Sequence, residues 1–243
     1  MKKRLILMCL LVFCVTLLAC KSDNKEGKAE DDNVNIQNFN IAEEMDNIVP
    51  ENYNNFIEKS AIYYSNYVNV SDYSNITYSI RRNATDADDD YSQRKFDEIY
   101  RIISEQSKVL SYPKEVLEKL IKIYGTNIQN EYENRKDVYD SFADYIYKQY
   151  GFNTIDEFNI DAEKKAEDYL KQKMIIYIIA YKNGIDVTKE EIINYIEELA
   201  NYYKYDSVSN LILEIGNELY EEVGYEILNE KVMNYLISIS TNI

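Results

Sequence analysis

The feature that most constrains the fold of this chain is an apolar run inside a long helical pattern. The pattern spans about residues 161–183, and within it residues 174–180 are Met-Ile-Ile-Tyr-Ile-Ile-Ala. A helix that is apolar on every side has to be surrounded by other elements, because any face left in water would expose hydrocarbon. We therefore expect a central, buried helix, which Asn183 and Gly184 end with a left-handed cap.

Apolar residues at steps of three and four predict further helices around this one. Thr188 and Glu191 form a capping box that starts the next helix, and Thr154 with Glu157 resembles a capping box for a short turn. Val138 lies on the expected core face of the third helix, which Gly151 ends. These patterns predict an all-α fold with helices at about 91–109, 113–128, 137–150, 161–183, 188–203 and 217–239.

The first 19 residues have the pattern of a secretion signal. Lys2, Lys3 and Arg4 precede an apolar run of about 14 residues, which is the order of a signal peptide. The run is short for a membrane-spanning helix, which needs roughly 20 apolar residues. We therefore expect residues 1–19 to direct export and then to be removed.

The end of this segment, Leu17-Leu18-Ala19-Cys20, resembles the lipobox of bacterial lipoproteins. That resemblance implies lipidation of Cys20, which becomes the first residue of the mature chain on the extracytoplasmic face of the cell membrane. Acyl chains contribute about 0.8 kcal/mol for each CH₂ that the bilayer buries. Residues 20–40 are mostly polar and are expected to form a flexible tether, whereas 41–90 show one helix after Pro50 and otherwise no clear pattern.

Composition excludes several classes of function. The chain carries 27 basic and 43 acidic residues, a formal net charge of −16, which disfavours nucleic acid as a partner. Histidine is absent, which removes the imidazole ligands of common zinc sites and the usual general base. We therefore expect no cofactor, no metal and no enzymatic activity.

An acidic stretch precedes the helix expected near Tyr91. Asp86, Asp88 and Asp90 alternate as in a calcium loop, but Tyr91 stands where such a loop needs Gly, and Asp97 stands where it needs a bidentate Glu. We interpret the acidic residues as favourable charges at a helix N-terminus.

Between Ala166 and Leu236 the order of motifs resembles one known family. An apolar helix with Lys171-Gln-Lys-Met-Ile-Ile-Tyr-Ile-Ile-Ala leads to Asn183-Gly-Ile-Asp-Val-Thr-Lys-Glu-Glu-Ile, and Asn229-Glu-Lys-Val-Met-Asn-Tyr-Leu closes the series. Leu110-Ser-Tyr-Pro before a helix adds a further match. These residues resemble the C-terminal, peptide-binding chaperone domain of trigger factor and its SurA-like relatives, over roughly residues 91–243.

This resemblance implies an arm-like helical domain that holds unfolded exported polypeptides. The ribosome-docking and isomerase domains of trigger factor have no counterpart in the sequence, so neither ribosome binding nor isomerase activity is expected. Candidate client-binding residues are Tyr124, Tyr132, Tyr202 and Tyr203, although each could instead belong to the core. The alternative is a surface lipoprotein that uses the same scaffold to dock one partner, and a solute-binding role is a weaker third possibility.

Overall fold

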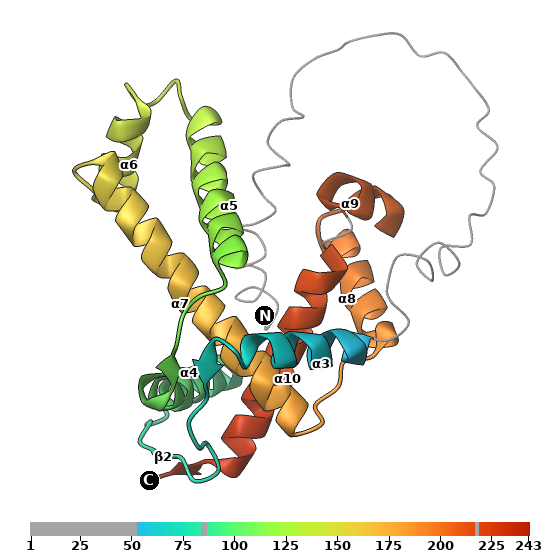
Figure 1. Cartoon of the computed structure of the whole chain (residues 1–243). Coiled ribbons are helices and arrows are strands. Elements are labelled where there is room, and N and C mark those ends of the chain that lie inside the picture. Colours follow the sequence, from blue (N-terminus) through green and yellow to red (C-terminus); the bar gives the residue numbers. More distant parts are fainter. Residues whose placement is uncertain (1–52, 84–86, 217–218) are drawn as a thin grey trace, which may run out of the picture.

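The structure is a computed structural model that describes residues 53–83, 87–216 and 219–243. The expected signal peptide, Cys20 and the tether lie outside the described residues, as does Pro50. In the described part, two helical arms project from a body of crossing helices (Figure 1). The strands in this part are only two residues long, and the other regular elements are helices. The all-α expectation is therefore confirmed.

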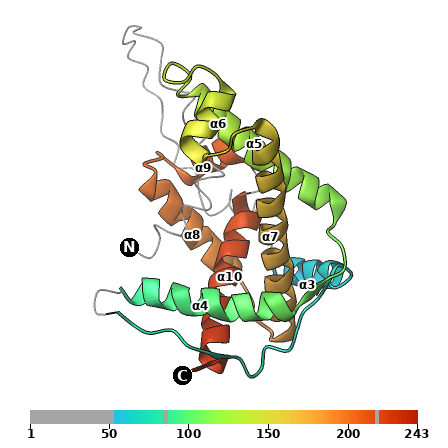
Figure 2. The ribbon, with the colours of Figure 1, turned by 90° about the vertical axis from the view of Figure 1, so that its left-hand side faces the viewer.

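Helices dominate the described residues. Arm one contains α5 (Lys114–Glu133), α6 (Phe142–Tyr150) and the first half of α7 (Ile155–Lys182), and arm two contains α8 (Lys189–Tyr202), α9 (Val208–Ile215) and the start of α10 (Leu219–Ile239). The body contains α3 (Tyr53–Tyr64), α4 (Asp88–Gln106) and the second halves of α7 and α10. In Figure 2, α4 lies across the lower part of α10, against which it packs.

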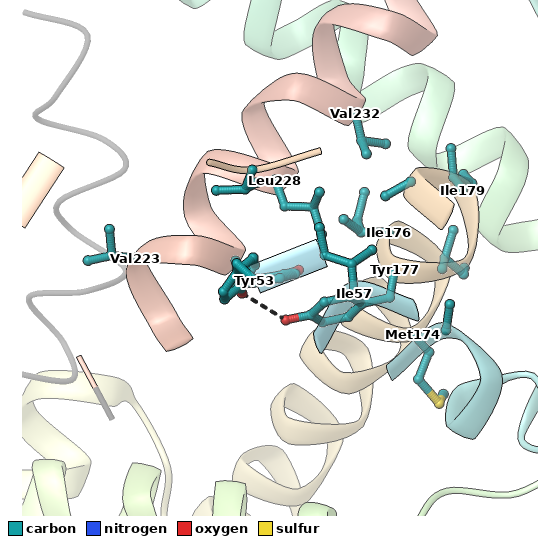
Figure 3. Close-up of a cluster of buried hydrophobic side chains, with 14 of the residues drawn as sticks. Tyr53, Ile57, Met174, Ile176, Tyr177, Ile179, Val223, Leu228 and Val232 are labelled. Carbon is teal, nitrogen blue, oxygen red and sulfur yellow. Dashed lines mark hydrogen bonds between the residues drawn. The ribbon is translucent and has the colours of Figure 1, made fainter. Parts of the chain in front are cut away.

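The second half of α7 is the centre of the core, as its apolar run predicts. Every residue from Met174 to Ala180 is buried. Helix α3 packs along one side of it and α10 along another, with Leu228 and Val232 facing it from α10 (Figure 3). The run is thus enclosed by elements from both ends of the described chain.

Tyr53 connects three of these helices at the start of α3. Its ring is buried, and its hydroxyl lies 3.4 Å from the hydroxyl of Tyr177 (Figure 3). The same hydroxyl donates a hydrogen bond of 3.1 Å to the carbonyl of Glu221 in α10. The ring lies directly on the backbone of Gly224, where no side chain could fit. Residues of the 41–90 segment are therefore integral to the core.

Both predicted caps around the α7–α8 connection are present. Gly184 has φ +60°, Ile185 N donates to Ala180 O at 3.0 Å, and Gly184 N donates to Tyr181 O at 3.3 Å, the pattern of a Schellman motif. Thr188 and Glu191 form a reciprocal capping box. These caps fix the sharp turn that sends the chain from the body into arm two.

The short strands tie the ends of the body together. β1 (Val68–Asn69) pairs antiparallel with β3 (Lys108–Val109), so Val109 belongs to a strand and not to the preceding helix. β2 (Thr77–Tyr78) pairs in parallel with β4 (Thr241–Asn242). The side chain of Asn242 also bonds both backbone groups of Ile80.

Arm one differs from its prediction in two places. Its middle helix begins at Phe142 after the cap Ser141, so Val138 lies in the preceding turn and is 72% exposed instead of facing a core. Thr154 does not cap a short turn but starts α7, which is 28 residues long and begins six residues before the predicted start. A helix of that length spans about 42 Å, enough to run from the core to the end of the arm.

Candidate functional site: the ends of the two arms

Arm one is held together by its own aromatic cluster, separate from the main core. Ile128, Tyr145, Ile146 and Phe158 are its buried members. The ring of Phe158 on α7 lies at the centre of this cluster. Its centroid is 6.0 to 6.2 Å from the ring centroids of Tyr124, Phe142 and Phe152.

A carboxylate on α5 fixes α6 within this arm. Glu131 Oε2 accepts hydrogen bonds from the hydroxyl of Tyr145 at 2.9 Å and from that of Tyr150 at 2.8 Å. Burial, followed by the hydrogen bond to Glu131, raises the pKa of Tyr150. Both phenols therefore stay neutral donors at physiological pH, and their hydrogen bonds hold α6 against α5.

The structure places two of the candidate tyrosines inside this packing. Tyr124 stacks on Phe158, and its hydroxyl accepts a hydrogen bond of 3.1 Å from Lys165. Tyr132 lies between the rings of Phe142 and Tyr145. Both are half-buried, so each supports the arm and offers only part of its ring to a partner.

Other apolar side chains of arm one point outward. Ile160 is 68% exposed, and it lies two residues from Phe158 on the opposite face of α7. Exposed with it near the end of the arm are Val138, Tyr147 and Ile155. These residues present hydrocarbon to solvent on a rigid support.

Arm two ends in a similar way. Leu213 on α9 is 83% exposed, although its neighbours Leu211 and Ile212 are buried against the main core. Tyr202 at the end of α8 is 55% exposed, and its ring lies 5.1 Å from the half-buried ring of Tyr203. Tyr202 is thus the most accessible of the four predicted contact residues, all of which still await a test.

Sequence reasoning missed Leu213 and Ile160. Both lie off the apolar stripe of their helix, and an apolar residue at an off-stripe position was the available signal. This signal could not be seen for Ile160, because the predicted helix began one residue later, at 161. It could not be seen for Leu213 either, because helix α9 was not predicted.

The described residues provide no group of three or more carboxylates or cysteines arranged to hold a metal ion. None of the helices described is long and apolar enough to cross a membrane. The arm ends present exposed apolar and aromatic side chains to the solvent.

Two helical arms with exposed apolar side chains at their ends thus project from one body of crossing helices (Figure 1), and the family comparison gives this architecture its class, a chaperone-type domain. The family model for the C-terminus of bacterial trigger factor matches residues 78–238, more than half of the chain, and the chain belongs to this family. The match begins 13 residues before the predicted start and includes the whole of α4. No curated protein and no solved structure matches the chain.

Proposed function

We propose that this protein is a membrane-anchored chaperone that holds unfolded polypeptides on the extracytoplasmic side of the cell membrane. The observation that carries the holding role is the exposure of Ile160 and Leu213 at the ends of the two arms in a trigger factor C-terminal domain. The pattern that ends at Cys20 supports the anchor and the location.

The physical requirement for holding is weak, reversible contact without sequence choice. An apolar side chain that becomes buried contributes about 1.5–3 kcal/mol before the cost of ordering the partner. A few such contacts on two arms bind an unfolded chain loosely and release it. A hydrogen-bonding site for one ligand is not needed for this task.

The test is suppression of aggregation of several unrelated unfolded proteins by the full chain. We expect Ile160→Ser with Leu213→Ser to weaken holding by roughly tenfold or more, because two apolar contacts are lost and even half of one contact's gross contribution of about 3 kcal/mol is a factor of about ten. Leu110→Ser is the matched control, since Leu110 is 51% exposed but lies in the body. It should hold clients as the wild type does.

Two outcomes would contradict the proposal. Equal loss in the double variant and in Leu110→Ser would show that the arm ends have no special role. Holding of no unfolded client, together with tight binding of one folded protein, would favour the alternative of a surface lipoprotein with a single partner.

A further inference from the structure

One group of exposed apolar side chains lies on the body and not at the end of an arm. Ile62 and Tyr63 of α3 and Leu110, the residue after β3, are all exposed. Helix α3 packs against α7 with its other face, so Ile62 and Tyr63 are apolar residues on the solvent side of an amphipathic helix. We call these three residues the body patch.

Contacts through Tyr67 connect the residues of the body patch. The ring centroids of Tyr63 and Tyr67 are 5.1 Å apart, and the amide of Leu110 donates a hydrogen bond of 2.8 Å to the carbonyl of Tyr67. Ile62 precedes Tyr63 in the last turn of α3. Tyr67 is half-buried and packs against the main core, so the body patch lies on packed residues of the body.

Exposed lysine side chains border the body patch. Lys59 lies one helical turn before Tyr63 on the same exposed face of α3, and Lys108 of β3 stands two residues before Leu110. A carboxylate, Glu58, also lies on this face of α3, where it accepts a hydrogen bond of 3.2 Å from the hydroxyl of a tyrosine in α7. The apolar residues of the patch therefore have cations beside them.

The charge of the chain around the body patch differs from that of arm two. Residues 53–82 and 107–124, which contain α3, the patch and the start of α5, carry seven basic and four acidic residues, a net charge of +3. Residues 189–226, which contain α8, α9 and the start of α10, carry two basic and ten acidic residues, a net charge of −8. The body patch thus lies in a positively charged part of a chain whose net charge is −16.

The body patch also lies on the helix to which the expected lipid anchor is connected. Residues 21–52, 32 residues in all, separate Cys20 from Tyr53 at the start of α3. A flexible chain of that length has a root-mean-square span of roughly 30 Å, and α3, with its 12 residues, is about 18 Å long. The surface of the bilayer is therefore within reach of the patch in an anchored protein.

We propose that the body patch docks on the surface of the membrane and contacts anionic phospholipids there. This inference rests on the anchor proposed above, which keeps the patch close to the bilayer. Tyr63 suits the interface because its ring is apolar and its hydroxyl is polar. Ile62 and Leu110 enter the boundary between headgroups and acyl chains, and the neighbouring lysines meet the phosphates. The same anionic surface repels the acidic arm two, which stays in the aqueous phase.

The experiment measures vesicle binding of the chain without its lipid, so that the patch is tested apart from the anchor. The expected mature chain, residues 20–243 with Cys20→Ser, contains every described residue. A polarity-sensitive fluorophore is attached at Ser111→Cys, next to Leu110, or at Asn210→Cys on α9, both exposed positions. The vesicles contain phosphatidylglycerol and phosphatidylcholine, or phosphatidylcholine alone.

We expect a blue shift of the fluorophore at position 111 with the anionic vesicles and none at position 210. High salt should reverse the shift, because it screens the attraction between the lysines and the phosphates. The contact is thus too weak to replace the lipid when membranes are washed with high salt.

Apolar variants locate the contact on the body. Ile62→Ser with Leu110→Ser should lower the affinity for anionic vesicles roughly tenfold, because two apolar side chains no longer enter the bilayer. The matched control is Ile160→Ser with Leu213→Ser at the arm ends, which should bind vesicles as the wild type does. In the aggregation assay the two double variants should exchange their behaviour.

Charge variants test the contribution of the lysines. Lys59→Gln with Lys108→Gln should weaken binding to anionic vesicles by roughly tenfold or more. The control, Lys136→Gln with Lys164→Gln, removes the same charge from exposed positions of arm one and should bind as the wild type does. Circular dichroism checks that all the variants are folded.

Equal binding to anionic and neutral vesicles, or an equal blue shift at positions 111 and 210, would overturn the proposal. So would a body-patch variant that keeps its vesicle affinity but loses the holding of unfolded clients, or one that loses only self-association in sedimentation equilibrium. The patch would then bind clients or a second copy of the chain. A wrong anchor would not change the vesicle result, because this assay contains no lipidated protein.

Discussion

At the scale of single residues, the contact between Tyr53 and Gly224 explains why a glycine lies inside α10. Glycine in a helix interior costs about 0.5–1 kcal/mol relative to alanine. Here the cost is offset because the Tyr53 ring occupies the space of a side chain and bonds the neighbouring carbonyl of Glu221. The Tyr53 ring of α3 can therefore lie directly against the backbone of α10.

Gly224→Ala should lower the free energy of unfolding by about 1–3 kcal/mol, the usual cost of overpacking, because the new methyl group would overlap the Tyr53 ring. The control is Gly125→Ala in α5, where an added Cβ meets nothing within 4 Å. That change should stabilise the protein by about 0.5–1 kcal/mol. Urea unfolding of both variants checks the prediction, which fails if the two changes have the same sign.

Glu226 gives a residue-scale prediction for stability against pH. Burial, and then the charge of Glu222, raise its pKa from 4.5 to about 7 in the folded protein, so between these values the folded state binds more protons than the unfolded state. Stability then falls as pH rises from about 4.5 to 7, by up to roughly 3 kcal/mol, and the loss is complete above 7.

Glu226→Gln should remove this slope, since glutamine has no proton to lose. The variant should be as stable as the wild type near pH 4.5 and more stable at pH 8. Thermal unfolding of both proteins at intervals of one pH unit measures the difference in stability between them. Groups that titrate in the same way in both proteins do not contribute to this difference. A difference that does not change with pH would contradict the prediction.

At the scale of secondary-structure elements, α7 combines two environments in one helix. Residues 174–180 in its second half are enclosed on every side, whereas its first half has a buried face at Phe158 and an exposed face at Ile160. The same substitution in the two halves therefore separates burial from helix propensity.

Ile178→Asp should unfold the domain or leave it molten, because a carboxylate without a partner would be buried at a cost of several kcal/mol. Ile160→Asp, the control on the same helix, should keep the wild-type helicity and melting temperature to within a few degrees. Circular dichroism during heating measures both. Similar melting temperatures for the two variants would mean that the core is not where the structure places it.

The prediction for α7 succeeded because its signals are local, whereas the failures came from an ambiguous short pattern and from contacts distant in the sequence. The burial of α7 is indicated by seven consecutive apolar residues, and its end is indicated by a Gly at the left-handed cap. Both signals lie within the helix or next to it, so the sequence pattern predicted both features. Helix α9 is only eight residues long and mostly apolar, and such a run does not distinguish a helix from a strand. The burial of Tyr53 depends on Tyr177 and Gly224, which are far away in the sequence, so no local pattern indicates it.

The site was harder to predict than the fold. Tyr202 is accessible, whereas the half-buried positions of Tyr124 and Tyr132 follow from how α6 folds back on α5 and α7. The opposite fates of Ile212 and Leu213 depend on which face of α9 meets the core. Exposure at arm ends is thus decided by tertiary packing that the sequence pattern does not specify.

At the scale of the whole molecule, the proposed anchor makes a prediction about location. Cys20→Ser should move the protein from the membrane fraction to the soluble fraction, because the thiol that accepts lipid is lost. Cys14→Ser, within the expected signal peptide, is the control and should leave the protein on the membrane. Fractionation after high-salt and alkaline washing measures this, and Cys20→Ser protein that stays with membranes would show the anchor to be wrong.

The parallel pairing of β2 with β4 has a consequence for the order in which the protein is made. Residues 241–243 are synthesised long after Thr77 and Tyr78, yet their backbone amides bond the carbonyls of Ile76 and Tyr78. Arm one, by contrast, is built from one continuous stretch of chain with its own aromatic cluster. When the chain is synthesised from its N-terminus, arm one can therefore fold early. The body can complete its packing only after α10 and β4 have been synthesised.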